Sequence, residues 1–209
     1  ESLLLYLKEQ TKIDETKLQA IISYDLDDDI NNPITDDEKQ KIVNALEKVK
    51  ILDPACGSGA FPIGALQKIV FILQQIDPNG KLWFKKQIAT ANPELRRDIE
   101  KKFSNNELDF IRKLGVIRNS IYGVDIQLIA TEISRLRCFL TLIVDEIIND
   151  EDENRGIKPL PNLDFKFVTA NSLIGLPKID DSPQQLLFDE RKSIEELRNL
   201  MDEFFSVDE

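Results

Sequence analysis

Apolar residues recur along this chain with two different periods, and the change between them separates predicted helices from predicted strands. Residues 2–10, 14–24 and 36–49 have apolar side chains at helical spacing. Thr35 precedes the third stretch and Glu38 follows three residues later, which is the capping-box pattern that begins a helix. We therefore predict three helices in the N-terminal part of the chain.

From residue 49 onward, short apolar runs alternate with helical stretches. Residues 49–53 form a run that ends at a turn rich in proline and glycine, and a predicted helix over 60–76 follows. The same order returns as a run over 120–125 and an apolar helix over 127–144, and a third run lies at 165–169. Strands separated by helical crossovers favour a parallel sheet. We predict an α/β fold with three parallel strands.

The remaining segments are more polar. Residues 83–118 favour helix and are interrupted at Asn92-Pro93, so we predict two or three surface helices there. Residues 145–155 carry six acids and predict a solvated loop. The predicted division is N-terminal helices over 1–48, an α/β domain over 49–176 with a helical insertion at 77–118, and a peripheral acidic tail over 177–209 with one helix at 193–205.

Composition excludes several kinds of chemistry. The 209 residues include no histidine, which rules out Ser-His-Asp and Cys-His catalysis and histidine-based zinc sites. Cys56 and Cys138 lie far apart in a chain without a secretory signal, so we expect them to be reduced. No apolar run approaches the length of a membrane span, and we expect a cytoplasmic protein without a membrane partner.

Charge is distributed unevenly. The net charge of −11 opposes tight binding of a phosphate backbone by the chain as a whole. Residues 81–118 nevertheless hold ten Lys and Arg against five Asp and Glu, a net of +5 that leaves −16 for the rest. These helices could face DNA, although charge on a helix surface more often serves solvation.

The most specific motif is Asp53-Pro-Ala-Cys-Gly-Ser-Gly-Ala-Phe61, between a predicted strand and a predicted helix. Gly57 and Gly59 allow the backbone to approach a ligand, and the following helix N-terminus favours an anionic group. A dinucleotide fingerprint would need a third glycine where Pro62 stands, and a phosphate-binding loop would need Gly-Lys-Ser/Thr. The motif therefore indicates another nucleotide-like ligand, and the alternative is a glycine-rich turn that binds nothing.

This string resembles the first motif of adenine-N6-specific DNA methyltransferases, of the kind found in type II restriction-modification proteins. The resemblance implies a partial doubly wound, Rossmann-like class I sheet and S-adenosylmethionine as cofactor. It implies that the loop wraps the methionine portion of the cofactor, with residues Asp53, Pro54, Ala55, Cys56, Gly57, Ser58 and Gly59. Cys56 is otherwise a small residue that fills the loop, with a reactive thiol as the alternative.

Two further strand ends resemble motifs of the same family. Asp125 ends the second predicted strand, where a carboxylate can accept both ribose hydroxyls, and Ile126 would pack on the adenine ring. Asp125 could instead be the N-cap of the next helix. Asn171 follows the third strand, where its amide oxygen could accept from the adenine amino group. Asparagine in a turn can also merely bond its own backbone.

The catalytic motif of the resembled family, Asn-Pro-Pro-aromatic, does not occur in this sequence. The Asn-Pro pairs of this chain are Asn32-Pro33 and Asn92-Pro93, and both lack the second proline and the aromatic residue. We therefore assign no catalytic residue, and we expect a piece of a longer protein that is inactive alone. Residues 25–36 depart from a calcium-binding loop at its glycine and at its closing glutamate, so we assign no metal site.

The resemblance implies that the parent protein methylates adenine N6 in duplex DNA, with catalytic and target-recognition regions outside this sequence. Related folds share the cofactor half, so a methyltransferase acting on RNA or on protein glutamine is an alternative. A non-catalytic module that binds the cofactor or docks onto partner domains is another. A DNA-binding module without enzymatic role is disfavoured by the acidic balance.

Overall fold

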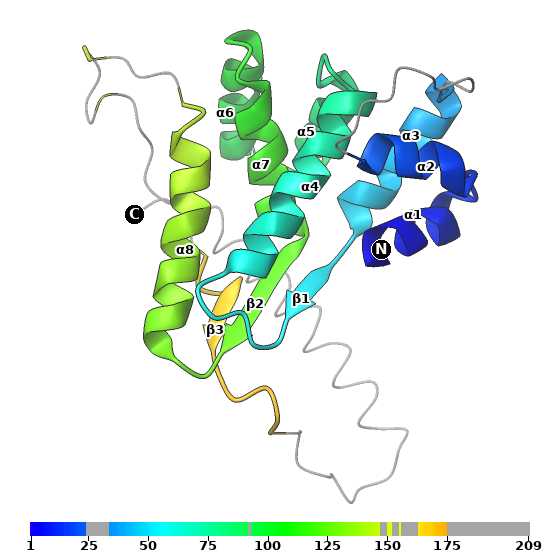
Figure 1. Cartoon of the computed structure of the whole chain (residues 1–209). Coiled ribbons are helices and arrows are strands. Elements are labelled where there is room, and N and C mark those ends of the chain that lie inside the picture. Colours follow the sequence, from blue (N-terminus) through cyan, green and yellow to red (C-terminus); the bar gives the residue numbers. More distant parts are fainter. Residues whose placement is uncertain (24–33, 92, 147–149, 152–154, 156–162, 175–209) are drawn as a thin grey trace, which may run out of the picture.

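The computed structural model describes residues 1–23, 34–91, 93–146, 150–151, 155 and 163–174. Among these residues, three helices precede the first strand, four helices lie between the first and second strands, and one helix lies between the second and third (Figure 1). In chain order the elements are α1 (Ser2–Thr11), α2 (Glu15–Ile22), α3 (Asp36–Lys48), β1 (Ile51–Asp53), α4 (Ala60–Ile76), α5 (Lys81–Thr90), α6 (Pro93–Ser104), α7 (Leu108–Asn119), β2 (Ile121–Asp125), α8 (Leu128–Ile143) and β3 (Phe167–Thr169).

The predicted capping box begins α3. The Thr35 amide donates to Glu38 Oε2 at 2.8 Å, and the Glu38 amide donates to Thr35 Oγ1 at 3.3 Å. Lys17 from α2 donates to the same Glu38 carboxylate at 2.8 Å. This local pattern therefore fixes the start of one helix and also ties it to its neighbour, which confirms the prediction for this segment.

The three strands form one parallel sheet in the order β1-β2-β3. Asp53 pairs with Gly123, and Asp125 pairs with Thr169, so the strands end close together. In Figure 1 all three arrows point toward the lower edge of the sheet. The carboxyl ends of the strands, with the segments that follow them, therefore share one edge, which we call the carboxyl edge.

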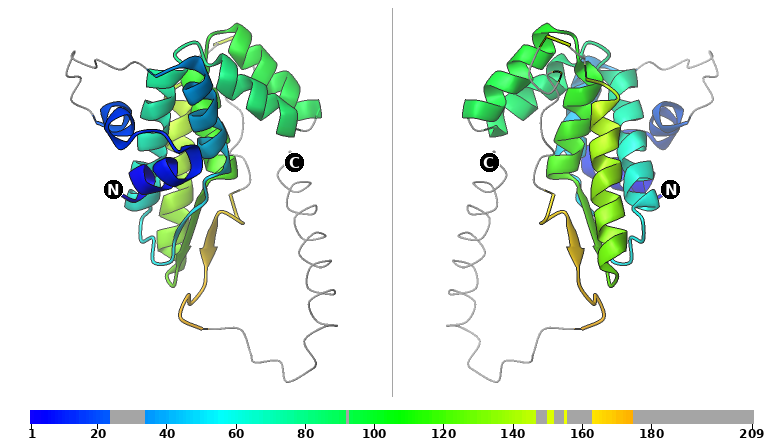
Figure 2. Two further views of the ribbon diagram at one scale, coloured as in Figure 1. Left: turned by 90° about the vertical axis from the view of Figure 1, so that its right-hand side faces the viewer. Right: turned by 90° about the vertical axis from the view of Figure 1, so that its left-hand side faces the viewer.

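The two faces of the sheet differ. Ile121 and Phe167 are buried on the face covered by α4, α7 and α8 (Figure 2). Because side chains alternate along a strand, Leu52 and Val168 point to the other face, where they are 61% and 39% exposed. Among the described residues, the helices that contact the sheet thus lie on one side of it, so the parallel α/β arrangement is present but its doubly wound character remains a prediction.

The stretch over 83–118 forms three helices, but α7 is not a surface helix as predicted. Seven of its residues are buried: Phe110, Ile111, Arg112, Leu114, Gly115, Val116 and Ile117. Trp83 of α5 is also fully buried, and its indole nitrogen donates to the Ile111 carbonyl at 3.3 Å. Apolar residues recur at helical spacing along α7 and pack against α4. The lysines and arginines between them are the reason that the sequence predicted a surface helix.

Several sequence predictions fall on residues outside the described ranges. These are the tail over 177–209 with its predicted helix at 193–205, most of the aspartate-rich stretch at 25–36, and parts of the acidic segment at 145–155. Within the described part of the chain, none of the helices combines the length and the apolar character needed to cross a membrane.

Candidate cofactor site

The loop over residues 54–59 joins β1 to α4 at the carboxyl edge and is attached to the neighbouring strand. The Cys56 amide donates to the Val124 carbonyl of β2 at 2.9 Å, and the Gly59 amide donates back to the Cys56 carbonyl at 2.9 Å. At its beginning, the Ala55 amide donates to Asp53 Oδ1 at 3.1 Å. The predicted motif is therefore a compact turn with a defined backbone path.

The two predicted glycines serve different purposes. Both have positive φ, 53° at Gly57 and 79° at Gly59, a conformation that side chains with a Cβ rarely adopt. A Cβ on Gly57 would meet nothing within 4 Å, whereas a Cβ on Gly59 would lie 2.8 Å from Ser134 Oγ. Gly59 is thus also needed for close packing on α8, while Gly57 leaves its side of the loop open to approach.

Asp125 brings the end of β2 into contact with this loop. Its Oδ2 accepts from the Gly57 amide at 2.8 Å, and its Oδ1 accepts from the Gln127 amide at 2.9 Å. The Gln127 and Gly57 amides hold the pKa of the Asp125 carboxyl below its ordinary value. Gln127, not Asp125, is the N-cap of α8. Asp125 is therefore an ionised carboxylate placed over the glycine loop.

The end of β3 completes the edge. The Ala170 amide donates to the Asp125 carbonyl at 2.9 Å, and Ser172 Oγ donates to the Pro54 carbonyl at 2.8 Å. Asn171 lies on the surface between them, where its Oδ1 accepts from the Leu173 amide at 3.0 Å. The structure thus brings all three predicted strand ends together. Asn171 makes a local hydrogen bond within its own turn, which is the alternative to a ligand contact that the sequence analysis left open.

Exposed apolar side chains surround the polar groups of this edge. Ile126 is 68% exposed, and Phe61 at the start of α4 is 62% exposed. Leu173 and Ile174, just after Asn171, are exposed as well. Sequence reasoning singled out Ile126 but not the other three. An edge that combines an ionised carboxylate with uncovered apolar groups suits a ligand with both a polar sugar and a flat ring.

Cys56 lies within the loop in a setting that disfavours a reactive thiol. Its side chain is buried, and burial is the largest cause that raises the pKa of its thiol, with the nearby carboxylates of Asp125 and Asp53 adding to it. Cys56 Sγ is 4.0 Å from Ser134 Oγ. Burial raises the pKa of Cys138, one turn further along α8, to about 12. Cys56 therefore fits the role of a small residue that fills the loop.

The basic helices lie at the other end of the molecule. Figure 1 shows α5 and α6 away from the carboxyl edge. Several of the cations are engaged within the protein: Lys102 contacts Glu107 at 3.0 Å and Glu146 at 2.9 Å, and Lys113 contacts Asp145 at 2.5 Å. This arrangement gives Lys102 and Lys113 a structural role within the protein.

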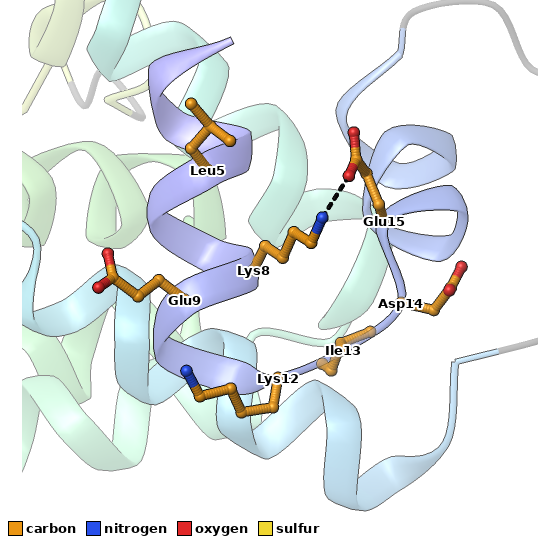
Figure 3. A pocket seen from close by; sticks show the side chains of 7 residues that line it. All are labelled: Leu5, Lys8, Glu9, Lys12, Ile13, Asp14 and Glu15. Carbon is orange, nitrogen blue, oxygen red and sulfur yellow. Dashed lines mark hydrogen bonds and ion pairs between the residues drawn. The ribbon is translucent and has the colours of Figure 1, made fainter.

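A hollow lies between α1 and α2 (Figure 3). Its lining comes from residues 5–15, and the ion pair between Lys8 and Glu15, at 2.5 Å, lies across it. None of the loop residues borders it. Within the described ranges, no group of three or more His, Cys, Asp or Glu is arranged to hold a metal ion.

Comparison with known proteins links the chain to one named relative. It is 37% identical over 174 residues, 81% of its own length, to the Methanocaldococcus jannaschii protein "Putative type II restriction enzyme and methyltransferase RM.MjaORFECS2P". The chain spans 12% of that relative's length. No family model and no solved structure matches the chain.

Proposed function

We propose that the carboxyl edge of this chain binds S-adenosylmethionine as the cofactor part of a DNA methyltransferase, one that methylates adenine N6 in duplex DNA within a restriction-modification protein. The similarity to the Methanocaldococcus jannaschii protein, named as a restriction enzyme and methyltransferase, supports this function. The resemblance of the motif at 53–61 supports the choice of adenine N6. The proposal keeps the domain boundaries predicted from the sequence, with a helical insertion at 77–118 and a tail over 177–209.

One observation carries the cofactor assignment. The Gly57 amide and Asp125 Oδ2 are 2.8 Å apart although the two residues are 68 positions apart in sequence. A glycine-rich turn after the first strand and a carboxylate at the end of the next are thereby joined at one edge. Open parallel sheets bind nucleotide-like ligands at this edge, beyond the carboxyl ends of their strands.

The residues fit the chemistry of the cofactor. The Asp125 oxygens that already accept from backbone amides each retain a further lone pair, so they can also accept from ribose hydroxyls. Ile126 offers an exposed apolar surface to the adenine ring. The loop amides and the N-terminus of α4 suit the carboxylate of the methionine end. When bound, S-adenosylmethionine supplies a methyl group on a positively charged sulfur.

We assign the transfer step itself to residues beyond this sequence. Asn-Pro-Pro-aromatic is absent here, and the adenine amino group must be oriented toward the methyl group before it can react. A base in duplex DNA must also leave the helix to reach such a pocket. The role proposed for this chain is to bind and orient the cofactor.

Calorimetric titration with S-adenosylmethionine tests the cofactor role. We expect the chain to bind, and Asp125→Ala to weaken binding about 10- to 100-fold, because hydrogen bonds to a charged group are lost. Glu9→Ala is the matched control, since it removes an exposed carboxylate that borders the α1–α2 hollow. Equal loss in both variants, or binding that neither variant changes, would refute the site.

Methyl transfer by the longer protein tests the substrate. The protein would be incubated with duplex DNA, RNA and protein substrates in the presence of labelled S-adenosylmethionine, and the DNA would be digested to nucleosides. We expect label in N6-methyl-2′-deoxyadenosine from DNA. Label in RNA or in protein glutamine would replace the DNA assignment, and cofactor binding without any transfer would indicate a non-catalytic module.

A further inference from the structure

The backbone of Gly57 is held by two different elements, one at its N–H and one at its carbonyl. Its amide donates to Asp125 Oδ2 at 2.8 Å, at the end of β2. Its carbonyl accepts from Ser134 Oγ at 3.1 Å, in the middle of α8. The proposed role of Asp125 is contact with the ligand, whereas Ser134 is fully buried beneath the loop. Ser134 can therefore influence a ligand only through the loop.

Contact between the loop and α8 is close at this serine. A Cβ on Gly59 would lie 2.8 Å from Ser134 Oγ, 3.1 Å from its Cβ and 3.2 Å from its Cα. The hydroxyl also lies 3.0 Å from the Ala130 carbonyl one turn earlier, so its single hydrogen is shared between two carbonyl acceptors. The site accommodates a small side chain with a donor, which is what serine provides.

The direction of the Gly57 carbonyl sets the direction of the next amide. In a trans peptide the carbonyl and the following N–H point to opposite sides, and the described part of the chain contains no cis bond. Because the Gly57 carbonyl points toward α8, the Ser58 N–H points away from α8. This amide is one of those that the proposed function assigns to the cofactor carboxylate.

We propose that Ser134 is a positioning residue that fixes the Gly57–Ser58 peptide so that the Ser58 amide faces the amino-acid end of the ligand. The inference rests on the proposed function for its ligand, but its structural part stands alone. Loss of the hydroxyl removes one hydrogen bond from the loop. The orientation of the loop should then become less well defined while the helix remains intact.

Amide hydrogen exchange tests the structural part without any ligand. Ser134→Ala would be compared with Cys138→Ala, which changes another fully buried side chain one turn along α8. We expect loop amides over 55–59 to exchange about 3- to 10-fold faster in Ser134→Ala than in Cys138→Ala, as expected for one lost hydrogen bond. Equal exchange in the two variants overturns the inference.

Two ligands test the positioning part. S-adenosylhomocysteine has the amino-acid carboxylate, and methylthioadenosine lacks it. We expect Ser134→Ala to weaken S-adenosylhomocysteine about 5-fold and to leave methylthioadenosine unchanged, whereas Asp125→Ala weakens both. Equal weakening of both ligands by Ser134→Ala would indicate a merely structural role. If the parent chain binds neither ligand, the proposed function fails, and hydrogen exchange alone decides the role of Ser134.

Discussion

Charged and polar groups are used differently at the two ends of this molecule. At the carboxyl edge, Asp125, Ser134 and Ser172 bond to the backbone of other segments and thereby shape a loop. At the opposite end, Lys102 and Lys113 pair with acidic side chains. The first arrangement defines a backbone surface that a ligand can use. The second neutralises charge between helices, so a high density of lysine and arginine in the sequence does not locate the site.

The largest effect is expected at the opposite end. In Lys102→Met, Glu107 and Glu146, whose side chains are 5% and 6% exposed, lose their shared cation. Leaving buried carboxylates unpaired costs about 3–5 kcal/mol. We expect urea unfolding to show a loss of this size, with unchanged S-adenosylmethionine affinity below the unfolding transition. Weaker S-adenosylmethionine binding by the folded variant would show that the two ends of the molecule do not act independently.

The next largest effect is expected at the carboxyl edge, where two glycines can be compared directly. Gly59→Ala introduces a Cβ 2.8 Å from Ser134 Oγ at a φ of 79°, and we expect a loss of about 2–4 kcal/mol in urea unfolding. Gly57→Ala introduces only backbone strain, so we expect it to lower the free energy of unfolding by about 1–2 kcal/mol. Equal losses would mean that the loop does not pack on α8 as closely as described.

A smaller effect on affinity alone is expected at Ile126. Ile126→Ala removes an apolar side chain that is 68% exposed, so stability should change little while S-adenosylmethionine affinity falls about 5-fold. Leu5→Ala is the control, because Leu5 is 56% exposed and borders the α1–α2 hollow. Calorimetry on both variants would show whether apolar surface at the carboxyl edge contributes to binding.

The smallest effect concerns pH and the N-terminal helices. Hydrogen bonds from Lys17 and Thr35 lower the pKa of Glu38 from 4.5 to about 2. A carboxyl whose pKa is lowered by folding stabilises the folded state at pH values above its ordinary pKa. This contribution is lost as the pH falls from about 4.5 toward 2. We expect the thermal midpoint of Glu38→Gln to fall less over this range than that of the parent chain. Parallel curves would exclude this contribution.

Periodicity and local motifs predicted most of the secondary structure. The helix over 60–76 has the predicted bounds, and the capping box begins α3 where Thr35 and Glu38 indicated. The strands begin one or two residues later than predicted, at Ile51, Ile121 and Phe167. The Ser120 and Lys166 carbonyls just before β2 and β3 nevertheless accept hydrogen bonds from the neighbouring strand. The burial of α7 was missed, since its core-facing residues are interleaved with Asp, Arg and Lys.

The site was only partly accessible from sequence. The glycine loop and Asp125 follow from motifs at strand ends, and parallel strands necessarily bring such ends to one edge. The support from Ser134 could not be inferred, because it joins residues 77 positions apart through a backbone carbonyl. Its one signal in the sequence is a serine at a core-facing position of α8, where Thr131 is also buried. Sequence left two uses open for Asn171, and the structure shows the local bond.

Amide chemical-shift mapping during titration with S-adenosylmethionine is the decisive test of whether the carboxyl edge is the cofactor site. We expect the largest changes on residues 55–59 and 125–127, and none on residues 5–15 of the hollow or on helix α6. Changes concentrated in the hollow or on α6, with the glycine loop unaffected, would contradict the assignment of the carboxyl edge as the cofactor site.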